Sequence, residues 1–431
     1  MDEAMLRRYL TWQHRWVGLL MTGVLIVVGI SGSILAFKLQ IDRLLNAELH
    51  VANSSKRPPL DLASLAERAE ADYPHLRAGY FSIEEDNVVM MVGARVNPAT
   101  GKPYDLGFDE LILDPWTGKT LGQGMEYGWT GPGLWRRKFL PFVYSLHTNL
   151  AGGSIGFRIV SIVALAWTLD CFVGFYLCLP RGVSRFWQRW AQAWKIKFGA
   201  NFTRINFDVH RAGGLWLWPL LFVFGWSSVM LELPQVYEPV MKTLFDYISQ
   251  EDYITNNSVP KPIENPKIGW RQAEEAGERA MAEQAALHHF TVERPYGMAY
   301  VSVYGAYTYC VRSSLDFRRR GWDTSVLIDG NTGRIRSVEL PRGQHAGNTI
   351  STLLWGIHYG DLRNFLPFRI LIFVLGLILP VLSVTGVLIW WKKRRVRKLA
   401  AFHHRPVYSG AVNNVDPGHG EAQSLIRRGS I

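Results

Sequence analysis

The chain has 431 residues, of which 48% are hydrophobic and only 19% are charged, and its formal net charge is +11. Globular proteins carry roughly 25% charged residues, so this composition argues against a soluble protein of two or three domains. The positive charge gathers beside long apolar runs, which favours a lipid bilayer as a partner and argues against nucleic acid.

Four apolar segments are long enough to cross a bilayer, which takes about 20 residues. They are 16–37, 159–179, 212–231 and 370–391, and the one charged residue inside them is Asp170. Basic residues cluster near the N-terminus, in 181–204 and in 392–398, whereas nearly all acidic residues lie in the two long connections. The positive-inside tendency therefore places both termini and 181–204 in the cytoplasm, and the long connections outside.

These boundaries predict a membrane α-helical protein with four transmembrane helices and two small periplasmic α+β domains. In chain order we expect a cytoplasmic N-terminus with the first helix (1–38), a first periplasmic domain (39–138), the second helix (139–180), a basic cytoplasmic loop (181–204), the third helix (205–233), a second periplasmic domain (234–350), the fourth helix (351–391) and a cytoplasmic tail (392–431).

The two halves of the chain resemble each other. Each outer segment contains a predicted helix, a predicted strand and an Asp-x-x-Thr-Gly turn, at 61–73, 88–92 and 113–119 in one half and at 270–286, 299–303 and 328–334 in the other. His147 precedes Arg158 at the same spacing at which His358 precedes Arg369. We infer an internal duplication of a helix–domain–helix unit.

One histidine stands just ahead of each apolar segment: His14, His147, His210 and His358. With the expected topology, His14 and His210 lie near the cytoplasmic face, and His147 and His358 lie near the outer face. Each face then holds two histidines from different helices. Haem b suits such a pair, because its iron takes two axial imidazoles and its flat ring fits between helices. The sequence therefore predicts two haem b groups, one at each face.

Four arginines are candidate partners for the haem propionates. Arg15 and Arg211 directly follow the cytoplasmic-side histidines, and Arg158 and Arg369 begin the spans on the outer side. A guanidinium matches a carboxylate in shape and charge. Arg15 and Arg211 can equally be ordinary flanking charges, because basic residues are expected at that face.

Zinc is the competing metal, but it takes three or four protein ligands. No Asp, Glu or Cys is placed to complete either histidine pair. Asp170 is a separate candidate, because a charge near the middle of the bilayer is costly. Its counterpart in the second half is Leu382, so the sequence places it outside the repeated arrangement, as either a neutral acid linking helices or a proton-handling group. Trp129 and Trp135 form either an aromatic belt or part of a ligand pocket.

With these residues in view, the chain resembles the bacterial PepSY-associated transmembrane helix family over residues 8 to about 398. The features that carry the resemblance are His14-Arg15, 114–118, His147, His210-Arg211, 329–333 and His358. Within that family it is similar to the inner-membrane ferric-siderophore reductases of the FoxB type. The resemblance implies a bacterial inner-membrane enzyme with PepSY-like periplasmic domains and two haem b groups, which passes electrons to ferric iron held by a siderophore.

The residues agree with this direction of transfer, because two haem sites at opposite faces would link the inner and outer surfaces. No nucleotide-binding motif is visible and the cytoplasmic segments are short, so a quinol or a separate reductase has to be the electron donor. Two other functions stay open. One is a membrane-anchored regulatory module that binds a partner through its outer domains, and the other is a di-haem cytochrome that serves another periplasmic acceptor.

Overall fold

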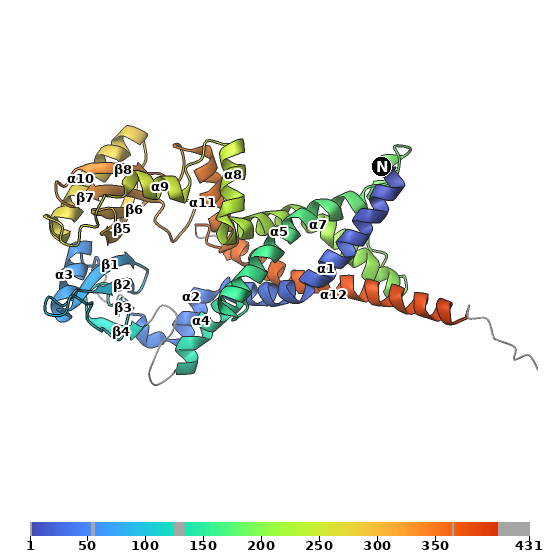
Figure 1. Cartoon of the computed structure of the whole chain (residues 1–431), viewed down its shortest axis with the longest axis horizontal. Helices are drawn as coiled ribbons and strands as arrows, with labels where there is room; N and C mark the ends of the chain where they lie inside the picture. The colour runs from blue at the N-terminus through green and yellow to red at the C-terminus, as the bar shows by residue number, and fades with distance from the viewer. Residues whose placement is uncertain (1, 53–56, 125–133, 364–365, 404–431) are drawn as a thin grey trace, which may run out of the picture.

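The computed structural model describes residues 2–52, 57–124, 134–363 and 366–403. It consists of a bundle of long helices and a sheet-bearing body at one end of the bundle (Figure 1). Among the described residues, four helices are long and apolar enough to cross a membrane: α1 (Glu3–Leu35), α5 (Gly153–Cys178), α7 (Phe202–Glu232) and α12 (Leu366–His403). The predicted four-span membrane protein is therefore confirmed at this level. We call the end that carries the sheet the sheet end, and the opposite end, which carries the N-terminus, the basic end.

The long helices pack in two close pairs, α1 along α12 and α5 along α7. Small residues make the first pairing possible. A Cβ atom on Gly29 would lie 2.6 Å from the backbone oxygen of Gly376, so the two backbones approach as closely as glycine allows. Nearby, the hydroxyl of Ser33 donates a hydrogen bond to the backbone oxygen of Phe373 across the same interface, at 2.9 Å.

Two shorter helices differ from the sequence-based boundaries. The prediction treats 139–180 and 351–391 as single spans, but each is divided into a short helix that ends near a histidine and a long helix that follows. The short helices are α4 (Leu134–Asn149) and α11 (Ala346–His358). Between α4 and α5 the helix is interrupted at Leu150 and Ala151, which have φ angles of 54° and 52°. A glycine is required at 156, where a Cβ atom would overlap the backbone oxygen of Asn149.

The outer segments form one continuous antiparallel sheet rather than two separate domains (Figure 1). Its strand order is β4-β3-β2-β1-β5-β6-β7-β8. The strands are β1 (Leu76–Ile83), β2 (Val88–Ala94), β3 (Glu110–Leu113), β4 (Thr120–Gly124), β5 (Val292–Val301), β6 (Ala306–Ser313), β7 (Thr324–Asp329) and β8 (Ile335–Glu339). The halves join where Phe81 of β1 pairs with Met298 of β5. Each of these strands would otherwise be an open edge with unpaired backbone groups, so their pairing removes two edges.

The core of this body also combines both halves. Helices α3 (Leu62–Asp72) and α10 (Trp270–His288) pack on the sheet, and one hydrophobic cluster contains buried residues of both helices and of strands from both halves. Glu274 of α10, which is 4% exposed, accepts hydrogen bonds from the backbone N–H groups of Leu62 and Ala63, each at 2.9 Å. A carboxylate of one half thus caps the first turn of the helix from the other half.

The predicted turns form in both halves. Asp114 accepts hydrogen bonds from the backbone and side chain of Thr117, and Asp329 does the same for Thr332. The glycine that completes each turn has a positive φ, 69° at Gly118 and 68° at Gly333. The Asp-x-x-Thr-Gly pattern therefore predicted the turns of the β3–β4 and β7–β8 hairpins, since only glycine adopts a positive φ without strain.

The bundle and the sheet are joined on the first half through α2 (Lys38–Leu45) and the 3-10 turn Ala47–Leu49. The His50 side chain lies between Asp42 and Asp86, with its two ring nitrogens each 3.1 Å from a carboxylate oxygen. Burial alone would lower the pKa of His50, but the hydrogen bonds and negative charges of the two aspartates outweigh it and raise the pKa above 6.5. The remaining short helices are α6 (Phe186–Ala191), α8 (Pro234–Leu244) and α9 (Gln250–Asn257).

Candidate functional site

The structure brings the four predicted histidines together as two facing pairs. His14 of α1 and His210 of α7 lie toward the basic end, with their ring centres 6.2 Å apart. His147 of α4 and His358 of α11 lie toward the sheet end, also with their ring centres 6.2 Å apart. A metal–imidazole bond is about 2 Å long, so two imidazoles that bind one ion from opposite sides have ring centres roughly 6 Å apart. Both pairs have this separation.

In three of the four rings the Nδ1 atom contacts a group that can only accept a hydrogen bond. His14 Nδ1 lies 2.8 Å from a carboxylate oxygen of Asp170, His147 Nδ1 lies 2.9 Å from the backbone oxygen of Val28, and His210 Nδ1 lies 3.0 Å from the backbone oxygen of Leu382. Nδ1 is therefore the protonated nitrogen in these rings, which leaves the lone pair on Nε2.

The fourth ring follows the same rule through a hydroxyl. His358 Nδ1 lies 2.8 Å from Ser227 Oγ, which itself donates to the backbone oxygen of Phe224 at 3.1 Å. The hydroxyl oxygen therefore accepts from His358. A histidine that binds a metal through Nε2 usually donates its Nδ1 proton to such a partner, which fixes the ring and its tautomer.

Glycines make room for three of the rings. A Cβ atom would lie 2.9 Å from His147 Cε1 if added at Gly32, 3.2 Å from His210 Cε1 at Gly386, and 3.5 Å from His14 Cε1 at Gly174. Gly174 and Gly386 occupy nearly matching places in the two halves of the sequence, one after His147 and the other after His358. Their shared role is to let α5 and α12 pass beside the histidine rings of α1 and α7.

Each histidine pair borders a large cavity. The basic-end cavity, of about 890 Å³, is lined by His14 and His210, and the sheet-end cavity, of about 1100 Å³, is lined by His147 and His358. Ligand pockets commonly measure about 300–1,000 Å³, so both can hold a large cofactor. Four residues line both cavities and separate them: Leu25, Trp167, Leu221 and Leu379.

Glycines that follow the histidines in the sequence differ in where they lie in the structure. Gly18 and Gly214 line the basic-end cavity, and a Cβ atom at either would meet no atom within 4 Å, so both leave open space beside the histidines. A Cβ atom at Gly213 would instead lie 3.2 Å from the Leu382 side chain. Gly152 and Gly153 stand at the start of α5 and do not line either cavity.

The basic-end cavity is rich in arginine, but the four candidate arginines of the sequence are not equivalent. Arg15 lines this cavity and forms no hydrogen bond or ion pair with another described residue. Arg211 also lines it, yet its guanidinium bonds the backbone oxygens of Gln192 and Ala193 and the carboxylate of Asp208. Arg181, which the sequence reasoning did not select, lines the cavity too. Arg15 and Arg181 are therefore the better placed to meet an anionic ligand.

The two candidate arginines of the sheet end, Arg369 and Arg158, occupy different positions relative to the cavity. Arg369 lines the cavity and forms no hydrogen bond or ion pair with another described residue. Arg158 is exposed on the outer side of α5 and is not part of the lining of either cavity. The equal spacing of the two arginines from their histidines therefore does not give them equal positions, because α5 and α12 turn different faces to the cavity.

The sheet supplies a polar roof to the sheet-end cavity, made by Tyr80, Glu84, Tyr296, Arg318 and Arg320. These residues come from β1, β5 and the adjoining loops, so the roof lies where the two halves of the sheet meet. Its charges are held in place: the Tyr296 hydroxyl donates to Glu84 at 2.8 Å, and the other oxygen of Glu84 lies 3.1 Å from Arg320 Nε.

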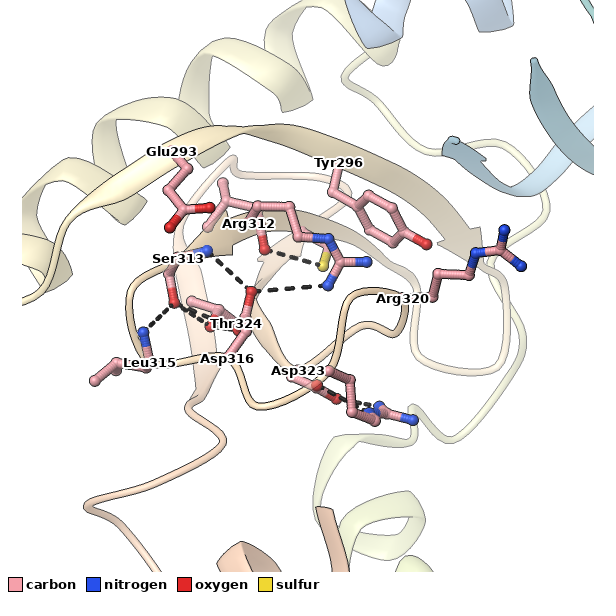
Figure 2. A network of polar contacts seen from close by, with 12 residues as sticks. Glu293, Tyr296, Arg312, Ser313, Leu315, Asp316, Arg320, Asp323 and Thr324 are labelled. Atoms are coloured by element: carbon pink, nitrogen blue, oxygen red, sulfur yellow. Dashed lines mark hydrogen bonds and ion pairs between the residues drawn. The ribbon is translucent and has the colours of Figure 1, made fainter. Parts of the chain in front are cut away.

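Figure 2 shows the buried polar network that contacts Tyr296 of this roof. The guanidinium of Arg312, which is 5% exposed, has its central carbon over the Tyr296 ring, 3.5 Å from the ring centre, and lies 3.7 Å from the carboxylate of Asp316. Asp316 is itself held by Thr324 Oγ1 at 2.6 Å and by the backbone N–H of Ser313 at 2.9 Å. Sequence patterns gave no indication of this buried network, because its members are spread over three strands and a loop.

The donor set of each pair suits haem iron better than zinc. Across residues 2–52, 57–124, 134–363 and 366–403, no three His, Cys, Asp or Glu side chains gather in a way that could hold a metal ion. A structural or catalytic zinc site needs three or four protein ligands. Two opposed imidazoles with fixed tautomers, a cavity beside them and arginines on its wall are instead what an axially ligated haem requires.

The sequence comparison placed Asp170 outside the repeated arrangement, but in the structure Asp170 takes part in it. It follows His147 at almost the same distance along the chain at which Leu382 follows His358. Each of the two contacts the Nδ1 atom of a basic-end histidine, Asp170 with its side chain and Leu382 with its backbone oxygen. The sequence comparison missed this because a backbone carbonyl leaves no trace in the identity of its residue.

Of the two tryptophans ahead of His147, Trp135 lies among the described residues. Trp135 is exposed and does not line the sheet-end cavity, and Trp129 lies outside the described residues. For Trp135 the structure therefore favours the aromatic belt over the ligand pocket.

Comparison with known proteins supports the membrane architecture. The sequence model of one protein family, the PepSY-associated TM region, matches residues 11–393. This match begins within α1, ends within α12, and includes α5, α7 and the whole sheet-bearing body. A comparison with curated proteins gave no match. The chain therefore belongs to the PepSY-associated TM family.

Proposed function

We propose that this protein is a di-haem b oxidoreductase of the bacterial inner membrane, which carries electrons from the cytoplasmic side or the quinol pool to an acceptor at the sheet end. The observation that carries the proposal is the geometry of the four histidines. Two independent pairs have the same 6.2 Å ring separation, and every ring has its Nδ1 atom bonded to an acceptor. A single pair could arise from ordinary packing, but a second with the same geometry is hard to explain without a ligand.

In this proposal His14 and His210 hold one haem, and His147 and His358 hold the other. Arg15 and Arg181 at the basic end and Arg369 at the sheet end would bind the propionates. When bound, the haems supply the one-electron chemistry, and the protein orients them, excludes water and sets their potentials. Trp167 lines both cavities and would lie between the two groups.

The duplication inferred from the sequence explains why the sites come in two copies. Each half contributes one histidine to each site, so neither half alone completes a pair. His14 and His147 come from the first half, and His210 and His358 come from the second. This dependence predicts that the two halves do not bind haem separately.

We further propose that the acceptor is ferric iron held by a siderophore, and that it docks under the roof of the sheet-end cavity. Five basic residues line this cavity, against the acids Glu84, Glu232 and Asp361: Lys38, Lys138, Arg318, Arg320 and Arg369. Aromatic groups beside them (Tyr80, Tyr296, Trp355 and Tyr359) offer flat apolar contacts. A bulky chelate with polar oxygens and an apolar periphery matches such a lining. Reduction by one electron gives the ferrous ion, which the chelate holds weakly.

The test is anaerobic reoxidation of the purified protein. The protein is reduced with dithionite, freed of excess reductant and mixed with ferric trihydroxamate or ferric triscatecholate siderophores in the presence of a ferrous-iron indicator. We expect the reduced spectrum to be lost in step with formation of the ferrous complex. The His358→Ala variant should not react, although its basic-end histidines are intact.

Two outcomes separate the alternatives. Rapid reoxidation by a quinone or a copper complex but by no ferric chelate would identify a di-haem cytochrome with another acceptor. A protein that binds no haem at all would leave the sheet-bearing body as a binding module anchored by four helices. Either result would overturn the siderophore reductase.

A further inference from the structure

The hydrogen-bond partners of the four histidines differ in one respect, their charge. Val28, Leu382 and Ser227 offer neutral oxygens to His147, His210 and His358. Only His14 has an anionic partner, the carboxylate of Asp170 at 2.8 Å. The basic-end pair therefore includes a carboxylate–histidine unit, and the sheet-end pair has none.

Among the described residues, the carboxylate of Asp170 has its ion-pair contact with His14. Asp170 is 7% exposed, and no lysine or arginine of the described residues forms an ion pair with it. Its second oxygen, Oδ1, is buried without a hydrogen-bond partner. A buried carboxylate interacts strongly with nearby charge, because little water or counter-charge screens it. The charge of an iron ion bound to His14 would lie close to this carboxylate.

We infer that Asp170 lowers the reduction potential of the haem held by His14 and His210 below that of the haem held by His147 and His358. A carboxylate that accepts the Nδ1 proton makes the imidazole a stronger electron donor, which favours the ferric over the ferrous ion. Its negative charge favours the more positive ion as well. This inference rests on the proposed function and extends it, because it gives electron transfer a direction.

The direction agrees with the placement of the acceptor. A lower potential at the site of His14 and His210 would favour the passage of one electron to the group held by His147 and His358, at the end where the acceptor docks. With Asp170 in place, this transfer runs toward the higher potential. Asp170 is thus a positioning and tuning residue that acts through His14, rather than a proton carrier.

The test is a redox titration of the purified full chain, followed by the absorption of its haems, for the wild type and the Asp170→Asn variant. Asparagine keeps an oxygen that can accept the Nδ1 proton, but it removes the charge. We expect the lower of the two midpoint potentials to rise and the higher one to stay in place. Ser227→Ala is the matched control, because it removes a neutral partner at the other site and should leave the lower potential unmoved.

Two results would overturn the inference. One is an Asp170→Asn protein with both haems bound and both potentials unchanged, which would leave Asp170 with a purely structural role. The other comes from His358→Ala, which retains only the basic-end haem and does not depend on the behaviour of the asparagine variant. Its single haem should titrate at the lower wild-type potential, and titration at the higher one would reverse the assignment. Absence of haem from the wild type would instead refute the proposed function itself.

Discussion

Replacement of Gly32 by alanine tests how tightly the sheet-end site is built. The added Cβ atom would lie 2.9 Å from His147 Cε1 and 3.3 Å from His147 Nδ1. Carbon atoms in ordinary contact are about 3.5–4.0 Å apart, so the ring has to move by about 0.6–1.1 Å. That movement would stretch the 2.9 Å hydrogen bond to Val28 and change the 6.2 Å separation from the His358 ring.

Overpacking of this kind costs about 1–3 kcal/mol, which corresponds to a roughly 5- to 150-fold loss of affinity for the sheet-end haem. The measurement is the haem count per chain, together with the rate at which haem is lost to apomyoglobin. Gly23→Ala is the control, because it lies on the same helix and its Cβ atom would meet nothing within 4 Å. If Gly32→Ala retains two haems with wild-type kinetics, these ring positions are not those of the functional protein.

Three further predictions concern the same molecule. Glu274→Gln should lower the free energy of unfolding by about 1.5–3 kcal/mol in denaturant titrations, because an amide offers one acceptor oxygen to two backbone N–H groups, whereas the exposed Glu275→Gln should change it little. His50, whose pKa is raised in the fold, stabilises the protein fully below pH 6.5 and loses that contribution as the pH rises through the raised pKa. The melting temperature should therefore fall as the pH rises above about 6.5, and His50→Gln should flatten this fall; an unchanged slope would exclude His50 as its source. Arg369→Gln should speed the loss of the sheet-end haem several-fold by removing a charged hydrogen bond, and Arg158→Gln should not; equal effects would contradict the different placement of the two arginines.

The sequence was sufficient where a local pattern determines the structure. Apolar length identified the four long helices, and Asp114 and Asp329 identified two hairpins because side chain, backbone and glycine act within one turn. Topology then paired His14 with His210 and His147 with His358, since residues that enter the membrane from the same side lie at the same depth. These pairings need no knowledge of side-chain contacts.

The rest depended on contacts between distant segments. The pairing of β1 with β5 joins strands from opposite halves of the chain, and nothing in either strand specifies the other as its neighbour. The short helices α4 and α11 were merged with the spans, although two glycines follow α4 at 152 and 153, and Asp361, Arg363 and Pro367 follow α11. Asp170 looked isolated because its equivalent is a backbone oxygen, and Arg158 looked equivalent to Arg369 because spacing does not say which face of a helix points inward.

The haem content of the purified protein tests the central claim most directly. Oxidised and dithionite-reduced spectra in mild detergent, with a pyridine haemochrome count, should show two low-spin b haems per chain. Single replacements of His14 or His210, and separately of His147 or His358, should each remove one haem and leave the other. A colourless protein from cells with adequate haem supply, or two haems retained in all four variants, would contradict the account.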